Sequence, residues 1–329
     1  MKKKNCVLVT GGAGYIGSVT SKLLLEDNNK VVIIDNLSSG RIQAIPNGAE
    51  FIKGDVGDKK LLEKIFKKYN FDCVIHLAAL IQVEESTKNP KKYFDNNVVA
   101  GLNLLQTMIS ARNCRKIVFS SSAAVYGVPK KVPIIEDSPL EPISPYGQTK
   151  KIFEIILKEY AKAKVIDSVA LRYFNVAGAL TTKDGAWGET HKPETHLIPL
   201  ILQSVKNKRT FTIYGDDYPT SDGTCVRDYI HVYDLAKAHI LAMKRRFKGI
   251  LVYNVGTGHG YSNKEVFEAA KKATKATIPY TIGSRRAGDC PILTAAPNKI
   301  KKELNFKPVK SDLATIIQDA WQFQRIKEL

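Results

Sequence analysis

The sequence contains no paired cysteine or histidine motif. Its five cysteines, at positions 6, 73, 114, 225 and 290, are odd in number and widely spaced, and no C-x-x-C occurs. The six histidines form no H-x-x-x-H pair. These absences leave no basis for a disulfide framework or for the common zinc motifs, so we expect reduced thiols and no metal site.

Long apolar runs are also missing, and none approaches the length of a transmembrane span. The apolar segment after residues 1–4 is only as long as a strand, which is not typical of a signal peptide. With 329 residues, 44% hydrophobic and 25% charged, the chain is long enough for a large globular domain with a smaller appendage. We therefore expect a cytoplasmic protein without a membrane partner.

Acidic residues are in deficit, since 50 Lys and Arg face 32 Asp and Glu, for a formal charge of +18. Such a charge can serve nucleic-acid binding. The basic pairs are spread along the chain, however, and no stripe with interleaved aromatic residues occurs; they are Lys59-Lys60, Lys67-Lys68, Lys91-Lys92 and Lys130-Lys131. This favours a solvated basic surface and no nucleic-acid partner, with an RNA-binding scaffold as the alternative.

Strand-like apolar runs alternate with helix-like stretches over the first half of the chain. The strand-like runs lie at 6–10, 31–35, 50–52, 72–77, 116–120 and 168–173. The helix-like stretches lie at 15–26, 59–69, 91–112 and 146–163. This alternation predicts the α/β class with a doubly wound, Rossmann-like parallel sheet, whose ligands bind at the carboxyl ends of the strands.

The alternation breaks after Asn175, where residues 178–226 become rich in Gly, Pro, Thr and Asp. A helix-like stretch at 234–243 and a strand-like run at 250–255 indicate a return to the main sheet, and a further helix is expected near 263–272. We predict a cofactor domain and a smaller, mixed α/β substrate lobe at the C-terminal side. The first takes residues 1–177 and 227–258, and the second takes residues 178–226 and 259–329.

A glycine-rich turn, Thr-Gly-Gly-Ala-Gly-Tyr-Ile-Gly at residues 10–17, stands between the first strand-like run and the first helix-like stretch. Glycine permits positive φ and a close approach of backbone N–H groups to a phosphate, with the positive end of the helix dipole behind them. Asp35 ends the next apolar run, 18 residues after Gly17. A carboxylate there accepts hydrogen bonds from a ribose and repels a 2′-phosphate, so the pair predicts NAD rather than NADP.

The pattern Tyr-x-x-x-Lys occurs four times, at Tyr126/Lys130, Tyr146/Lys150, Tyr160/Lys164 and Tyr233/Lys237. Only Tyr146 follows a helix-start signal, Ser144-Pro145, after the fifth strand-like run. A lysine one helical turn away stabilises a phenolate, and we expect it to lower the tyrosine pKa from its usual value near 10. Such a tyrosine can take a proton from a sugar hydroxyl. The serine-rich turn at 120–127 places a further hydroxyl at the end of that strand.

These motifs, in this order, resemble the extended short-chain dehydrogenase/reductase family, and within it the sugar-nucleotide epimerases, almost from end to end. Further matching segments are Asp35-Asn36-Leu37, Gly54-Asp55-Val56, residues 95–98, residues 171–175, residues 223–232 and residues 285–289. The resemblance implies NAD-dependent inversion at C4 of a UDP-hexose, which interconverts UDP-glucose and UDP-galactose, in a homodimer. Another UDP-sugar, a UDP-N-acetylhexosamine or a UDP-uronate, remains an alternative substrate.

The family's site roles transfer to matching positions. The resemblance implies that the catalytic set is Ser122, Tyr146 and Lys150. The implied cofactor residues are Gly11, Gly14, Tyr15, Ile16, Gly17, Asp35, Asn36, Asp55, Val56, Leu77, Ala78, Ala79, Asn96, Tyr146, Lys150 and Phe174. The implied substrate residues are Ser122, Asn175, His196, Leu197, Arg227, Arg286, Asp289 and Leu293. Two arginines suit a diphosphate, because guanidinium groups bind phosphate oxygens bidentately.

Three positions distinguish this chain within the resemblance. Residues 77–81 read Leu-Ala-Ala-Leu-Ile where better-known members end this segment in a lysine. Leu293 stands at the family's size gate for N-acetylated sugars, where some members have tyrosine and dual-specific members have a small residue. Ala123-Ala124 follow Ser122 where related dehydratases and decarboxylases carry carboxylates, so the proton carriers for elimination are absent.

Overall fold

The computed structural model describes residues 4–286 and 288–326, and the chain divides into two compact units. Unit 1 comprises Met1–Gly127, Pro139–Arg172 and Ala236–Tyr253. Unit 2 comprises Val128–Ser138, Tyr173–Leu235 and Asn254–Leu329. This division differs from the predicted boundaries of the two domains mainly at 227–235 and 128–138, and the pairing of the strands explains why.

Unit 1 is built on a seven-stranded sheet with the order β12-β6-β5-β4-β1-β2-β3. Its strands are β1 Cys6–Thr10, β2 Lys30–Asp35, β3 Glu50–Lys53, β4 Cys73–His76, β5 Lys116–Ser122, β6 Asp167–Tyr173 and β12 Ile250–Val255. The strand order reverses between β1 and β4, which pair in parallel. The predicted doubly wound parallel sheet is confirmed, and a crevice at such a reversal is where ligands of this fold bind.

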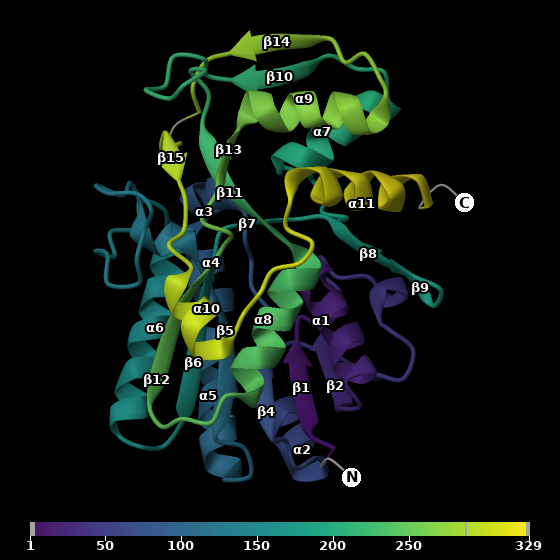
Figure 1. Cartoon of the computed structure of the whole chain (residues 1–329). Helices are drawn as coiled ribbons and strands as arrows, with labels where there is room; N and C mark the ends of the chain where they lie inside the picture. The colour runs from purple at the N-terminus through teal and green to yellow at the C-terminus, as the bar shows by residue number, and fades with distance from the viewer. Residues whose placement is uncertain (1–3, 287, 327–329) are drawn as a thin grey trace. The chain divides into compact units, whose positions relative to one another are not determined.

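Helices pack around this sheet (Figure 1). They are α1 Tyr15–Glu26, α2 Lys59–Lys68, α3 Val83–Lys88, α4 Pro90–Phe94, α5 Ala100–Ala111, α6 Pro145–Lys162 and α8 Val232–Lys244, with the 3₁₀ turns η1 Ile42–Ala44 and η3 Ala123–Tyr126. The helix expected over 91–112 is present as an unbroken helical segment over residues 90–111, in which a π-helical turn, η2 Asp95–Val99, lies between α4 and α5. Such a turn adds a residue to the helical repeat without changing which residue types occur.

The core of unit 1 lies on both faces of the sheet. Val7, Leu8 and Val9 on β1 are fully buried, as in a parallel strand with both faces covered. Phe66 of α2, Leu104 of α5 and Phe153 of α6 form one apolar cluster with Leu8. Burial of each such side chain contributes about 1.5–3 kcal/mol relative to exposure, so the carboxyl ends of the strands stand on a rigid base.

Unit 2 is a mixed α/β unit, as predicted. Its strands are β7 Asn175–Ala177, β8 Ala179–Thr182, β9 Gly185–Gly188, β10 Phe211–Tyr214, β11 Val226–His231, β13 Gly260–Ser262, β14 Tyr280–Gly283 and β15 Ile292–Leu293. Its helices are α7 Leu197–Lys206, α9 Asn263–Thr274, α10 Asn298–Leu304 and α11 Leu313–Ile326. Strand β11 pairs with β7, β13 and β15, which places 226–231 in this unit.

Two pairings outside the main sheet complete unit 2. Ile134 forms a parallel bridge with Ala295, which draws residues 128–138 into this unit. Strands β10 and β14 run side by side next to α9 (Figure 1), where the Phe267 ring contacts the rings of Phe211 and Tyr280. Across the described residues, no helix combines the length and apolarity needed to cross a bilayer.

Candidate functional site

The turn between β1 and α1 requires glycine at both ends. Gly11 has φ +70°, and a Cβ there would lie 2.6 Å from the backbone N of Ala78. A Cβ on Gly17 would overlap the carbonyl oxygen of Gly11. Gly14, which precedes α1, has no side chain with which to cap the helix. The turn therefore packs tightly on the sheet side and leaves the amino end of α1 open to an anion.

The segment after β4 lies against this turn through its backbone. The N–H of Leu77 donates to the carbonyl of Thr10 at 3.1 Å, and the N–H of Ala78 donates to the Thr10 hydroxyl at 3.3 Å. Asn97 holds Leu80 of the same segment, since its side chain accepts from Leu80 N at 2.8 Å and donates to Leu80 O at 2.9 Å. Sequence reasoning named Asn96 and missed this positioning role of its neighbour, although Asn97 lies in the same matching segment.

Three predicted cofactor residues form a polar cluster at the carboxyl ends of β2 and β3. The Asp35 carboxylate accepts from the backbone N–H groups of Ala13 at 3.0 Å and Leu37 at 2.8 Å. Asn36 donates to the Asp55 carboxylate at 2.7 Å. A cavity of about 580 Å³ adjoins them, lined by Asp55 and Asn96 among others. The glycine turn and this polar cluster lie at the carboxyl ends of neighbouring strands and fit a dinucleotide, whereas the cavity adjoins the cluster only at Asp55.

The predicted catalytic residues meet where β5 and α6 approach each other. Ser122 ends β5, and Tyr146 is the second residue of α6, whose first turn is capped by Ser144 and started by Pro145. The Ser122 hydroxyl is hydrogen-bonded to the Tyr146 phenol. Lys150 Nζ lies 5.8 Å from the centroid of the Tyr146 ring and donates to the Ser120 carbonyl at 2.8 Å. All three side chains therefore gather at one strand end.

Burial dominates the electrostatics of this group. Tyr146 is 8% exposed and Lys150 is 4% exposed. Burial raises the pKa of Tyr146, and the hydrogen bond from Ser122 only partly offsets it. Burial also lowers the pKa of Lys150 to about 7, against the raising effect of Glu154. Our expectation of a lowered tyrosine pKa is therefore wrong for the chain alone, because both groups lose hydration.

The depressed pKa of Lys150 predicts a pH-dependent stability. In the cofactor-free fold Lys150 loses its proton above about pH 7, whereas an unfolded lysine keeps its proton up to about 10.5. The free energy of unfolding of the wild type, relative to that of Lys150→Met, therefore rises as the pH increases between these values. We expect the rise to be about 2 kcal/mol from pH 7 to 9. Urea unfolding at both pH values measures it. For the exposed control Lys158→Met, the difference in free energy of unfolding from the wild type should be the same at pH 7 and pH 9. The prediction is contradicted if the corresponding difference for Lys150→Met does not change between these pH values.

A buried ion pair lies behind Lys150. The Glu154 carboxylate on α6 accepts from Arg172 Nε on β6 at 2.9 Å, and from Arg172 Nη2 at 2.5 Å. Ser121 also donates to Glu154, and Arg172 Nη1 donates to the Tyr126 hydroxyl at 2.9 Å. The ion-pair side chains are 5% and 6% exposed. This network ties α6 to β5, β6 and η3, and it was absent from the sequence-based prediction.

In unit 2, the predicted phosphate-binding arginines converge on one carboxylate. Arg227 Nη2 lies 3.4 Å from Asp289 Oδ1, and Arg286 Nε lies 3.1 Å from Asp289 Oδ2. Arg227 also donates to the Cys290 carbonyl at 2.8 Å. In the pairing of β11 with β15, Arg227 lies opposite Leu293. Four predicted substrate residues are thus brought together. Ala287, in the same matching segment, lies outside the described residues.

The remaining predicted residues are distributed over other parts of unit 2. Asn175 begins β7, in register with Tyr229 of β11. Phe174 is buried in unit 2, whereas the other predicted cofactor residues belong to unit 1. His196 and Leu197 stand at the start of α7. The His196 side chain contacts two glutamates, Glu189 and Glu194.

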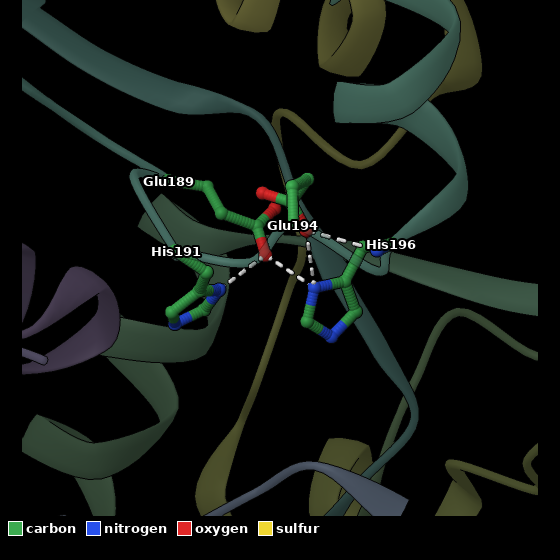
Figure 2. A group of neighbouring side chains, drawn as sticks. All are labelled: Glu189, His191, Glu194 and His196. Atoms are coloured by element: carbon green, nitrogen blue, oxygen red, sulfur yellow. Dashed lines mark hydrogen bonds and ion pairs between the residues drawn. The ribbon is translucent and has the colours of Figure 1, made fainter. Parts of the chain in front are cut away.

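Those contacts are part of a cluster that sequence reasoning missed, shown in Figure 2. Glu189, His191, Glu194 and His196 each place one potential ligand atom within 4.8 Å of the others. The cluster contains no His-x-x-x-His pair of the helical kind. Its residues follow the spacing Glu-x-His-x-x-Glu-x-His in the connection between β9 and α7. This spacing of Glu and His residues is the feature of the sequence that indicates the cluster.

The NAD dependent epimerase/dehydratase family matches residues 7–256. This chain belongs to that family. Over 322 residues it is 50% identical to the UDP-glucose 4-epimerase of Lactobacillus helveticus, covering 97% of each chain.

Two solved epimerases share the fold of this family member. The UDP-glucose 4-epimerase of Brucella ovis, solved in complex with NAD, is 45% identical with a TM-score of 0.91, covering 97% of this chain and 98% of that one. The enzyme of Bifidobacterium longum, solved in complex with NAD+ and UDP, is 39% identical with a TM-score of 0.92 and coverages of 98% and 99%.

Proposed function

We propose that this member of the NAD dependent epimerase/dehydratase family is a UDP-glucose 4-epimerase. It interconverts UDP-galactose and UDP-glucose by transient oxidation at C4 of the hexose. The observation that carries the proposal is the grouping of Ser122, Tyr146 and Lys150 at the end of β5, in a unit whose first strand leads into a glycine turn. The full-length relatives named above share this activity by name.

The cofactor in this proposal is NAD, held by unit 1. The tight turn through Gly11 and Gly17 leaves the uncapped amino end of α1 to the pyrophosphate, and Asp35 offers a carboxylate to a ribose and opposes a 2′-phosphate. The predicted residues Tyr15, Ile16, Val56 and Asn96 complete the proposed site. Bound NAD supplies an acceptor that takes a hydride from the sugar and returns it.

The chain's own chemistry is proton transfer. We assign to Tyr146 the removal of the proton from the 4′-hydroxyl, and to Ser122 a hydrogen bond to the Tyr146 phenol. A protonated Lys150 and the cationic nicotinamide of bound NAD would favour the phenolate that burial opposes. Ala123 and Ala124 follow Ser122 and offer no carboxylate to a neighbouring carbon, so elimination has no proton carrier. Oxidation followed by reduction is the reaction that these side chains support.

Binding of the UDP moiety falls to unit 2. Arg227 and Arg286 are held close together by Asp289, and two guanidinium groups so placed suit a diphosphate. Asn175, His196 and Leu197 complete the proposed contacts, and Leu293 bounds the sugar. Firm contacts to UDP with loose contacts to the hexose suit a 4-keto sugar that turns about its diphosphate and receives the hydride on its other face.

A panel of UDP-sugars without added NAD tests this function. We expect conversion of UDP-galactose to UDP-glucose, followed by chromatography, without net change in NAD. Parallel reactions with UDP-N-acetylgalactosamine and UDP-glucuronate report whether Leu293 admits a larger group. If only an N-acetylated or uronate sugar is converted, the proposed substrate is wrong. If no sugar is converted and the protein shifts RNA in a gel at physiological salt, the protein is an RNA-binding scaffold and not an epimerase.

We also propose that the chain is a cytoplasmic homodimer joined through α5 and α6. Core packing accounts for Leu105, Ile109 and Ile156. Val99, next to α5, is 52% exposed and Ile155 on α6 is 49% exposed, which leaves apolar surface for a second copy. Sedimentation at micromolar concentration tests it, and a monomer mass would contradict it.

A further inference from the structure

The connection between β9 and α7 brings two carboxylates and two imidazoles to one point (Figure 2). Glu189 Oε1 lies 2.9 Å from His191 Nδ1 and 2.6 Å from His196 Nδ1, and Glu194 Oε1 lies 3.0 Å from His196 Nδ1. In a tetrahedral site with bonds of about 2.0–2.2 Å, neighbouring ligand atoms lie roughly 3.4 Å apart. The three contacts are shorter than that, and all four atoms lie within 4.8 Å of one another, so small side-chain movements bring them to the spacing that a bound ion requires.

The two carboxylates need a cation between them. The side chains of Glu189 and Glu194 are only 7% and 5% exposed, so both are largely removed from water. Like charges at this separation and burial repel each other unless a positive charge neutralises them. The His196 imidazole supplies that charge in the metal-free chain, because its hydrogen bonds to both glutamates outweigh burial and raise its pKa to about 10. A divalent ion in contact with both oxygens takes its place.

The backbone holds one ligand in place. Glu194 Oε1 accepts from the N–H groups of Thr195 at 2.8 Å and His196 at 2.9 Å. Such outer hydrogen bonds orient a carboxylate toward a metal and are typical of built metal sites. Because the His196 side chain is 44% exposed, an ion can enter from solvent.

We infer that Glu189, His191, Glu194 and His196 form a binding site for a divalent transition metal ion of the zinc type. Two imidazole nitrogens with two carboxylate oxygens suit Zn²⁺ better than Mg²⁺ or Ca²⁺, which prefer oxygen alone. Four protein ligands close the coordination sphere, so the ion is structural and fixes the chain leading into α7. This replaces the sequence-based expectation of no metal site with a specific proposal for one.

Metal binding is tested on the full chain, purified without a histidine tag and stripped with a chelator. Titration with Zn²⁺ against a chromophoric chelator is expected to show one equivalent bound, with a rise in Tm as the free ion increases. Co²⁺ in the same site is expected to give the visible ligand-field bands of a four-coordinate ion. The readout does not use epimerase activity, so it stands apart from the proposed function.

His191→Asn tests the site itself. Asparagine keeps an N–H donor near Glu189 but removes the imidazole, and we expect Zn²⁺ affinity to fall by more than about 100-fold, since even outer hydrogen bonds are worth about 10- to 100-fold. His259→Asn, on an exposed histidine elsewhere in unit 2, should bind as the wild type does. Glu194→Gln should repeat the loss. Absence of Zn²⁺ binding by the wild type, or unchanged affinity in both cluster variants, overturns the inference and leaves an ion-pair network.

Discussion

Tyr146→Phe is expected to lower kcat for the conversion of UDP-galactose to UDP-glucose by about 10²- to 10⁴-fold while NAD binding is retained. The substitution removes only the hydroxyl that Ser122 contacts, and it leaves an aromatic ring of the same shape at a position that is 8% exposed. The loss should fall on kcat rather than on KM, because the phenol acts on the proton in transit and not on the UDP moiety.

Tyr160→Phe is the matched control. Tyr160 lies on the same helix and heads another Tyr-x-x-x-Lys match, but it packs against the apolar core of unit 1. Its variant should keep wild-type turnover. Bound NAD is quantified in both variants after denaturation, so that a loss of cofactor is separated from a loss of chemistry. Near wild-type turnover by Tyr146→Phe, with NAD bound, contradicts the assignment of the base.

Local sequence suffices to predict the sheet of unit 1. A strand covered on both faces is apolar at nearly every position, so continuous runs such as residues 250–255 can be read directly and coincide with β12. The helix over residues 15–26 coincides with α1 for a related reason, since the glycine turn marks its start. Because the strands and α1 can be predicted, so can the turn and the strand end that carry Gly11 and Ser122.

Unit 2 is harder to predict because its strands are short and partly exposed. Strand β14 carries Tyr280 and Ile282 at 50% and 43% exposure, so it shows no alternation of buried and exposed residues. Its pairing with β10 joins segments far apart in the sequence. Such pairing depends on tertiary contacts that no local pattern encodes.

Side-chain electrostatics depend on the same tertiary contacts. The spacing of Tyr146 and Lys150 predicts that their side chains lie close together, and the structure confirms this. The direction of the tyrosine pKa shift, however, depends on burial. The Glu154–Arg172 pair likewise joins a helix and a strand whose residues carry no shared motif. Chemistry can be predicted from residue type and spacing, whereas its energetics require the packed fold.

Glu154→Gln is expected to lower the free energy of unfolding by about 3–5 kcal/mol. The amide removes the negative charge that Arg172 faces at 2.5 Å and turns one acceptor into a donor, so a buried guanidinium loses its counter-charge. Because the pair connects α6 to β6, the start of α6 that carries Tyr146 should loosen as well. Urea unfolding of the cofactor-free chain measures the change.

Two controls separate a lost ion pair from a general defect. Glu159→Gln removes an exposed partner of Lys162 on the same helix and should cost less than about 0.5 kcal/mol. The double variant Glu154→Leu/Arg172→Met removes both buried charges, and it should be more stable than Glu154→Gln because neither charge is left alone. If Glu154→Gln unfolds at the wild-type urea concentration, the ion pair does not hold α6 on the sheet. Placement of Tyr146 then rests on the Ser144 cap and the apolar face of the helix alone.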